Sequence, residues 1–203
     1  LTALTVTGAA MAQVNIGVHT GVNFSSAKAT GSGQSSDGKI LVGFHAGVTA
    51  DIALTPELHA MPMLQFIQKG TKVKDEQTLL GQSIKAEGTT TINYVQLPLN
   101  IVYNFDLGES AKFFVGTGPS IAYGVSGKIK LSTSSLLGTQ TTDRKINFGG
   151  DQADDSKPFD LGWNGLAGIK FNNGFALMLN YTHSLTDLSP ADNTSYKGRS
   201  FGL

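Results

Sequence analysis

ILVGFHAGVTADIAL, the stretch from Ile40 to Leu54, decides the fold, because an apolar residue occupies every even position along it. Most of the odd positions carry small or polar residues, among them His45 and Asp51. Successive side chains of a β-strand point to opposite faces, so the pattern predicts a strand with one apolar face and one small, polar face. A strand tilted across a bilayer needs roughly 9 to 11 residues. The stretch is long enough to be a transmembrane β-strand.

Other segments of the chain repeat this alternation, and the links between them alternate between short and long. The short links lie near residues 55, 106 and 172, and outer-membrane barrels likewise have short periplasmic turns and longer extracellular loops. The pattern predicts an all-β fold, an eight-stranded antiparallel up-and-down transmembrane β-barrel over residues 13–203. Its predicted strands are 14–24, 40–54, 58–69, 91–105, 113–125, 159–171, 175–185 and 196–203, and its long links are 25–39, 71–89, 126–158 and 187–195.

A soluble eight-stranded barrel of the lipocalin type is the main alternative, since its strands also alternate. Such a barrel places large apolar residues inside and charges outside. Here the face opposite the large apolar residues is rich in Gly, Ser, Asn, His and Gln, which suits a narrow polar lumen. A charge on the lipid face costs roughly 2 to 4 kcal/mol at mid-membrane. The near-absence of charges from that face therefore favours the membrane barrel.

The first residues differ from the rest of the chain. LTALTVTGAAMAQ is apolar and small, and Ala10-Met11-Ala12 fits a small-x-small cleavage pattern. We interpret residues 1–12 as the remnant of a signal peptide, which predicts export. The last predicted strand stops at Leu203 without the terminal aromatic residue that barrel proteins often carry, so we expect truncation there as well.

Three segments resemble a known family. They are INYVQLPLNIVYNF (Ile92 to Phe105), FFVGTGPSIAYGVSG (Phe113 to Gly127) and LTPELHAMPMLQFIQKGTK (Leu54 to Lys72). The chain is similar there to the outer-membrane β-barrel domain common in Bacteroidetes, which includes the PorT-like proteins. The resemblance implies an eight-stranded barrel of the OmpA/OmpX type, and it accounts for Pro98 and Pro119 inside predicted strands. Met63 departs from the family pattern, which often has a carboxylate at that position.

Candidate chemistry is confined to one small polar group. His19 and His45 are predicted at similar depth on neighbouring strands, both facing the lumen, with Asp51 deeper on the same face. Two histidines and one carboxylate meet a minimal ligand count for a transition metal. The alternative is that they belong to the hydrogen-bonded polar filling of a narrow barrel. We favour that alternative and predict no catalytic residue, no metal and no cofactor; His183 is expected on the outward face.

The favoured functional hypothesis is a non-enzymatic integral protein of the outer membrane with an envelope-structural or loop-mediated binding role. Eight strands leave an interior just filled by side chains, so no wide pore is expected. The predicted partners are outer-membrane lipid and an extracellular or envelope protein bound through the 126–158 loop. With zero net charge the chain is not expected to bind nucleic acid, and a monomer is expected. Two alternatives stay open: a PorT-like accessory of protein secretion, and a lipid-modifying or proteolytic barrel enzyme.

Overall fold

A computed structural model describes residues 14–31, 34–79, 82–108, 110–135, 138–151, 154–191 and 194–203. Every regular element in these ranges is a β-strand, and none of their residues forms a helix long and apolar enough to span a membrane. The strands are β1 (Val14–Gly31), β2 (Gln34–Asp37), β3 (Lys39–Ala53), β4 (Leu58–Leu79), β5 (Gln82–Asp106), β6 (Ala111–Ser135), β7 (Gly138–Lys145), β8 (Phe159–Phe171), β9 (Ala176–Ser184) and β10 (Thr194–Gly202).

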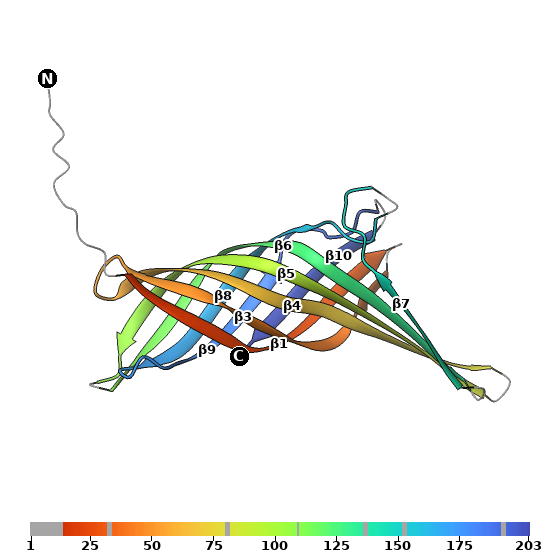
Figure 1. The fold of residues 1–203 in the computed structure, drawn as a ribbon, viewed down its shortest axis with the longest axis horizontal. Coiled ribbons are helices and arrows are strands. Elements are labelled where there is room, and N and C mark those ends of the chain that lie inside the picture. The colour runs from red at the N-terminus through yellow and green to blue at the C-terminus, as the bar shows by residue number, and fades with distance from the viewer. Residues whose placement is uncertain are drawn as a thin grey trace, which may run out of the picture.

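The sheet closes into a barrel, as Figure 1 shows. Neighbouring strands follow the order β10-β9-β8-β6-β5-β4-β3-β1, all pairings are antiparallel, and β10 pairs with β1 to complete the circuit. Two short strands lie outside the circuit, since β2 pairs with the end of β1 and β7 with the end of β6. The predicted eight-stranded up-and-down barrel is therefore confirmed.

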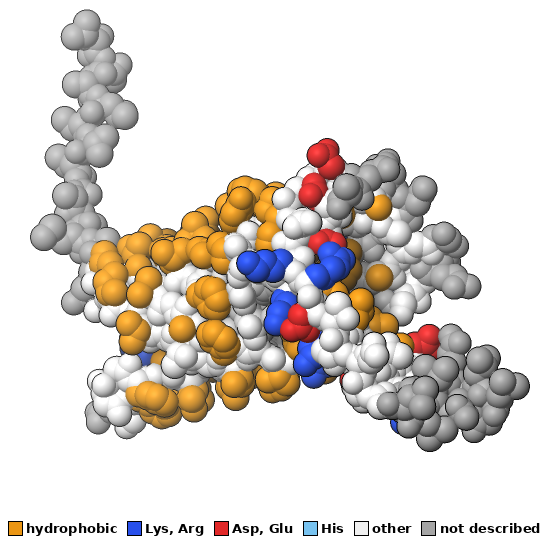
Figure 2. Space-filling model, turned by 45° about the vertical axis from the view of Figure 1, so that its right-hand side comes forward, with side chains coloured by type: hydrophobic (Ala, Val, Ile, Leu, Met, Phe, Trp, Pro, Cys, Tyr) orange, Lys and Arg blue, Asp and Glu red, His pale blue; other side chains and the backbone are white. Residues whose placement is uncertain are grey.

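The strand β3 carries the alternation as predicted. Its even residues Val42, Phe44 and Val48 are exposed on the outside, whereas His45 and Asp51 are buried inside. The other barrel strands follow the same rule, and in Figure 2 hydrophobic side chains cover much of the barrel wall. Outward apolar residues on further strands include Val18, Leu64, Phe66, Val95, Leu97, Leu99, Ile101, Val115, Ile121, Leu161, Leu177 and Leu179. This apolar exterior matches a hydrocarbon environment.

Side chains fill the lumen. Two apolar clusters lie inside it, one containing Met61, Met63 and Phe114, the other containing Ile67 and Tyr94. They explain why the alternation is weaker along the predicted strand 58–69: its inward residues are apolar because they pack against side chains from β5, β6 and β8. Polar side chains occupy the levels between and around the two clusters.

The short links are tight turns, as predicted. In the turn between β8 and β9, Gly174 has φ +87°, a backbone conformation that glycine adopts at no steric cost. By the rule that short turns of outer-membrane barrels are periplasmic, this end faces the periplasm and the opposite end faces the exterior.

The prediction that residues 126–158 form a loop is wrong for the first part of that range. Instead β6 continues to Ser135, and β7 pairs back onto it from Lys145 to Gly138. The predicted loop 71–89 is likewise the outer part of the β4–β5 hairpin, and part of 25–39 is the β1–β2 hairpin. A sheet outside the membrane needs no apolar face, because its backbone ladder and cross-strand hydroxyl pairs supply the contacts. Two such pairs are Ser132–Thr141, at 3.1 Å, and Ser134–Thr139, at 2.9 Å.

Candidate functional site

His19 and His45 lie together in the lumen, as the alternation indicated. Their ring centroids are 5.9 Å apart, on the paired strands β1 and β3. Nε2 of His19 lies 3.0 Å from Oε1 of Gln65, and its Nδ1 lies 3.0 Å from Oγ1 of Thr49. Both nitrogens of His19 are thus engaged by neutral side chains.

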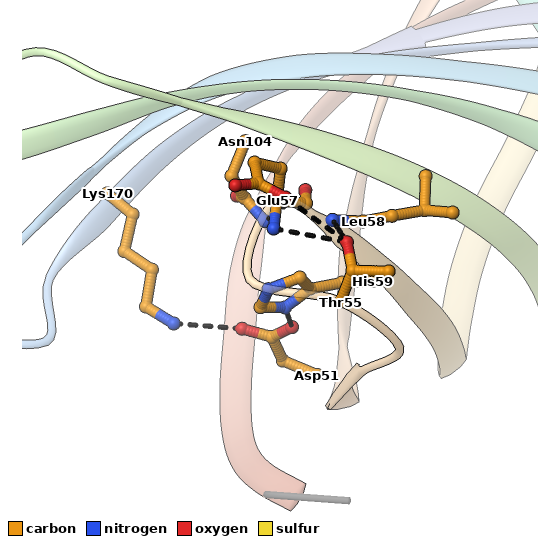
Figure 3. A network of polar contacts seen from close by, with 7 residues as sticks. All are labelled: Asp51, Thr55, Glu57, Leu58, His59, Asn104 and Lys170. Carbon is orange, nitrogen blue, oxygen red and sulfur yellow. Dashed lines mark hydrogen bonds and ion pairs between the residues drawn. The ribbon is translucent and has the colours of Figure 1, made fainter.

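Asp51 does not join this pair. Its carboxylate lies closer to the periplasmic end, where Oδ1 is 2.5 Å from Nδ1 of His59 and Oδ2 accepts a hydrogen bond of 2.9 Å from Nζ of Lys170 (Figure 3). The three side chains belong to β3, β4 and β8, so the contacts join separate parts of the barrel wall. Within the described ranges no three or more His, Asp or Glu side chains are arranged to hold a metal ion.

Sequence reasoning missed His59 and Lys170 as partners of Asp51. Lys170 directly precedes Phe171, which the alternation places outward, so the inward direction of Lys170 was available from the sequence. The contact between Lys170 and Asp51 was not available from the sequence, because the two residues are 119 positions apart along the chain.

A second polar layer crosses the lumen between the two apolar clusters. Nε2 of Gln96 donates to Oγ of Ser120 at 2.7 Å, and Nδ2 of Asn164 donates to Oδ1 of Asn100 at 2.9 Å. The hydroxyl of Thr182 donates to Oδ1 of Asn164 at 2.8 Å. These side chains come from β5, β6, β8 and β9, so hydrogen bonds link strands around the lumen at this level.

A small cavity lies near the outer mouth of the lumen, between Lys69, Tyr94 and Asp160. Its volume is about 20 Å³, enough for one water molecule. Nζ of Lys69 is 5.5 Å from the centroid of the Tyr94 ring, and Oδ2 of Asp160 accepts a hydrogen bond of 2.9 Å from Ser184. Among the described residues Oδ1 of Asp160 is buried without a protein partner, so a water molecule in this cavity has a polar group to bind.

A groove of the described residues lies outside the membrane. β4, β5 and β6 extend beyond the apolar exterior and, with β7, form a protruding sheet (Figure 1). One side of this sheet has a groove of about 420 Å³, whose lining includes Val73, Ala86, Ile129 and Leu131. Val73 is 54% exposed and Leu131 is 52% exposed, so apolar side chains here face solvent rather than lipid.

Charged pairs also lie on the protruding sheet, and Glu87 of one pair is among the residues that line the groove. Lys74 forms an ion pair with Glu87, and Nζ of Lys128 is 2.6 Å from the carboxylate of Asp143. The hydrogen bond from Lys74 lowers the pKa of Glu87, and that from Lys128 lowers the pKa of Asp143. These carboxylates are charged near neutral pH, so each cancels one lysine charge on this surface.

The closed sheet, the apolar exterior and the filled lumen define an integral membrane β-barrel. A family model for the outer membrane protein beta-barrel domain matches residues 10–189, and the chain belongs to that family. The protein is therefore an outer-membrane protein. No curated protein matches the sequence significantly.

Solved structures of two proteins are similar to this chain. One is Ail, the attachment invasion locus protein of Yersinia pestis, with 16% identity, 91% of this chain and 94% of that chain covered, and a TM-score of 0.36. It has also been solved in complex with the heparin analogue sucrose octasulfate, at a TM-score of 0.32. The other is Neisserial surface protein A, with 13% identity, coverage of 93% and 96%, and a TM-score of 0.36.

Proposed function

We propose that this protein is a non-enzymatic binding protein of the outer membrane, and that its protruding sheet contacts a protein partner outside the cell. The observation that carries the proposal is the continuation of β4, β5 and β6 past the apolar exterior, with β7 added at the edge. Spanning the bilayer needs roughly 9 to 11 residues per strand, and β5 and β6 have 25 residues each. The additional length serves neither the membrane nor the lumen.

The protruding sheet offers two kinds of contact. Its groove exposes Val73 and Leu131, and apolar side chains at the centre of an interface contribute much of the binding free energy. Its edge strand β7 is exposed at every residue and pairs with β6 on one side. An extended segment of a partner can add to such an edge through backbone hydrogen bonds.

An enzymatic role has less support. His59 contacts the carboxylate of Asp51, and in the described part of the chain no hydroxyl is hydrogen-bonded to its ring. His19 contacts the hydroxyl of Thr49, but its other nitrogen meets the amide of Gln65 instead of a carboxylate. Neither arrangement is a Ser-His-Asp type of triad. The PorT-like role in secretion rests on the sequence resemblance alone.

Photo-crosslinking in intact cells tests the binding role. We expect a photoreactive residue at Val73 or Leu131 to give a discrete protein adduct, because both positions face the exterior groove. The same residue at Leu97, on the lipid-facing wall, is the control and should give no such adduct. Absence of a protein adduct from both groove positions, with the barrel folded and inserted, would overturn the proposal.

A further inference from the structure

Three pairs of lysines lie directly opposite one another on neighbouring strands, near the exterior end of the barrel. The register pairs Lys28 with Lys197, Lys39 with Lys72, and Lys128 with Lys145. Directly opposed residues of an antiparallel pair share a face, with Cβ atoms roughly 4.5 to 5.5 Å apart, and like charges in that arrangement are destabilising. We call these six residues the lysine band.

The lysine band lies where the apolar exterior ends. Phe24 and Phe201 lie opposite each other on the outside of β1 and β10. On the same face, the next opposed pair is Ser26–Arg199 and the one after it is Lys28–Lys197. On β6 the outward Val125 is followed by Lys128. Figure 2 shows Lys and Arg side chains gathered at this boundary between the hydrophobic wall and the hairpins. In the membrane, this is the level of the outer-leaflet headgroups.

Carboxylates of the chain balance only part of this charge. Asp143 pairs with Lys128, Glu87 pairs with Lys74, and Asp37 lies 3.3 Å from Arg199. In the register of β1 and β2, Asp37 lies opposite Lys28. The hydrogen bond from Lys74, together with the charges of Lys39 and Lys72, lowers the pKa of Glu87. Asp37, Glu87 and Asp143 thus face the six lysines of the band together with Lys74 and Arg199. The band therefore carries surplus positive charge that an external anion would neutralise.

A fourth opposed pair provides an internal comparison. Lys112 and Lys170 are paired near the periplasmic end. There each ammonium has its own carboxylate, since Lys112 lies 3.0 Å from Asp106 and Lys170 lies 2.9 Å from Asp51. At the periplasmic end each opposed lysine thus has one carboxylate, whereas at the outer headgroup level lysines outnumber the carboxylates near them.

We propose that the lysine band binds the phosphate groups of a phosphorylated lipid of the outer leaflet, with each opposed pair directing two ammonium groups at one phosphate. Charge-assisted hydrogen bonds to phosphate are stronger than neutral ones. A lysine near an anionic membrane surface strengthens binding by about fivefold. The bound anion would also remove the repulsion within each pair. This site is separate from the groove of the protruding sheet.

Native mass spectrometry of the folded full chain, in a neutral detergent, tests the site. The probes are bisphosphorylated lipid A and its dephosphorylated form. We expect the protein to retain the phosphorylated form roughly tenfold better, and the K39Q/K72Q and K28Q/K197Q variants to lose most of that preference, because each removes two ammonium groups. The K39R/K72R variant keeps both positive charges and should retain the preference for the phosphorylated lipid.

The control K112Q removes a lysine charge at the periplasmic end, away from the band, and should bind as the unmodified chain does. Heat-modifiable migration on gels shows that each variant is folded. Equal retention of the two lipids, or unchanged retention in both glutamine variants, would overturn the proposal. So would complete displacement of the lipid by inorganic phosphate at millimolar concentration, since the site would then recognise the free anion. If the phosphorylated lipid stays bound in the presence of inorganic phosphate, the result supports a lipid as the ligand.

Discussion

Asp51 is a charged residue near the periplasmic end of the lumen that contacts side chains of two other strands. Its side chain is 12% exposed, and its two oxygens contact His59 and Lys170 from different strands. A buried carboxylate is costly unless it is paired and hydrogen-bonded, and here both oxygens have partners. These contacts join β3, β4 and β8, which are not all neighbours in the sheet.

The substitution Asp51→Asn should destabilise the barrel. The amide keeps the shape of the carboxylate but loses the charge, so Lys170 and His59 lose a charged hydrogen-bond acceptor. We expect a loss of about 2 kcal/mol in the free energy of unfolding, measured by urea titration of the protein in detergent. Glu57→Gln, in the exposed turn nearby (Figure 3), is the matched control and should change stability by less than about 0.5 kcal/mol. Equal midpoints for the two variants would show that the Asp51 contacts contribute nothing.

At the residue scale, the sequence predicts the face to which a side chain points better than it predicts the side chains that it contacts. Alternation correctly placed His19, His45 and Asp51 on the inward face, and it put the two histidines at one depth. It also placed Asp51 deeper on that face, but it did not identify His59 and Lys170 as the partners of Asp51, because the lumenal partner of a side chain depends on which strands face each other across the barrel. Gln65 reaches His19 although β4 and β1 are not paired strands. Such contacts depend on how the barrel closes and how its strands tilt, and the periodicity of a single strand predicts neither.

At the element scale, the same limit explains the missed strands. Inside the bilayer a strand must present an apolar face to lipid. Because of this requirement, the membrane-spanning parts of β3, β5 and β6 could be predicted from the alternation of apolar residues. Outside the bilayer no such periodicity is imposed, so the polar sequence within 126–158 predicts a loop although part of it forms strands. Threonines at 89–91 and at 139, 141 and 142 were an available signal, because β-branched residues favour strands.

Within β6, close packing of neighbouring strands limits what Gly118 can become. A Cβ on Gly118 would lie 1.9 Å from the carbonyl oxygen of Leu99, whereas one on Gly165 in β8 would meet nothing within 4 Å. We expect Gly118→Ala to lower the free energy of unfolding by roughly 1 to 3 kcal/mol, because backbone must move. Gly165→Ala should change it by less than about 0.5 kcal/mol. Urea titration compares the two, and a fully tolerated Gly118→Ala would show that β5 and β6 are not this close.

At the scale of the whole molecule, the filled lumen predicts a barrel that does not conduct as a porin does. Apolar clusters around Phe114 and Tyr94 lie on either side of the hydrogen-bonded layer at Gln96. Single-channel recording in planar bilayers should therefore give no stable, large conductance steps after insertion. Reproducible porin-like steps from folded protein would contradict the packing of the lumen.

The central claim is a barrel that crosses the outer membrane with its hairpins outside and its short turns in the periplasm. The chain has no cysteine, so single cysteines introduced at chosen positions report access directly. Labelling of intact cells with a membrane-impermeant maleimide should modify Thr141→Cys in β7, spare Val48→Cys on the lipid-facing wall, and modify Glu57→Cys only after the outer membrane is permeabilised. Labelling of Glu57→Cys but not Thr141→Cys in intact cells, or equal labelling at all three positions, would contradict the account.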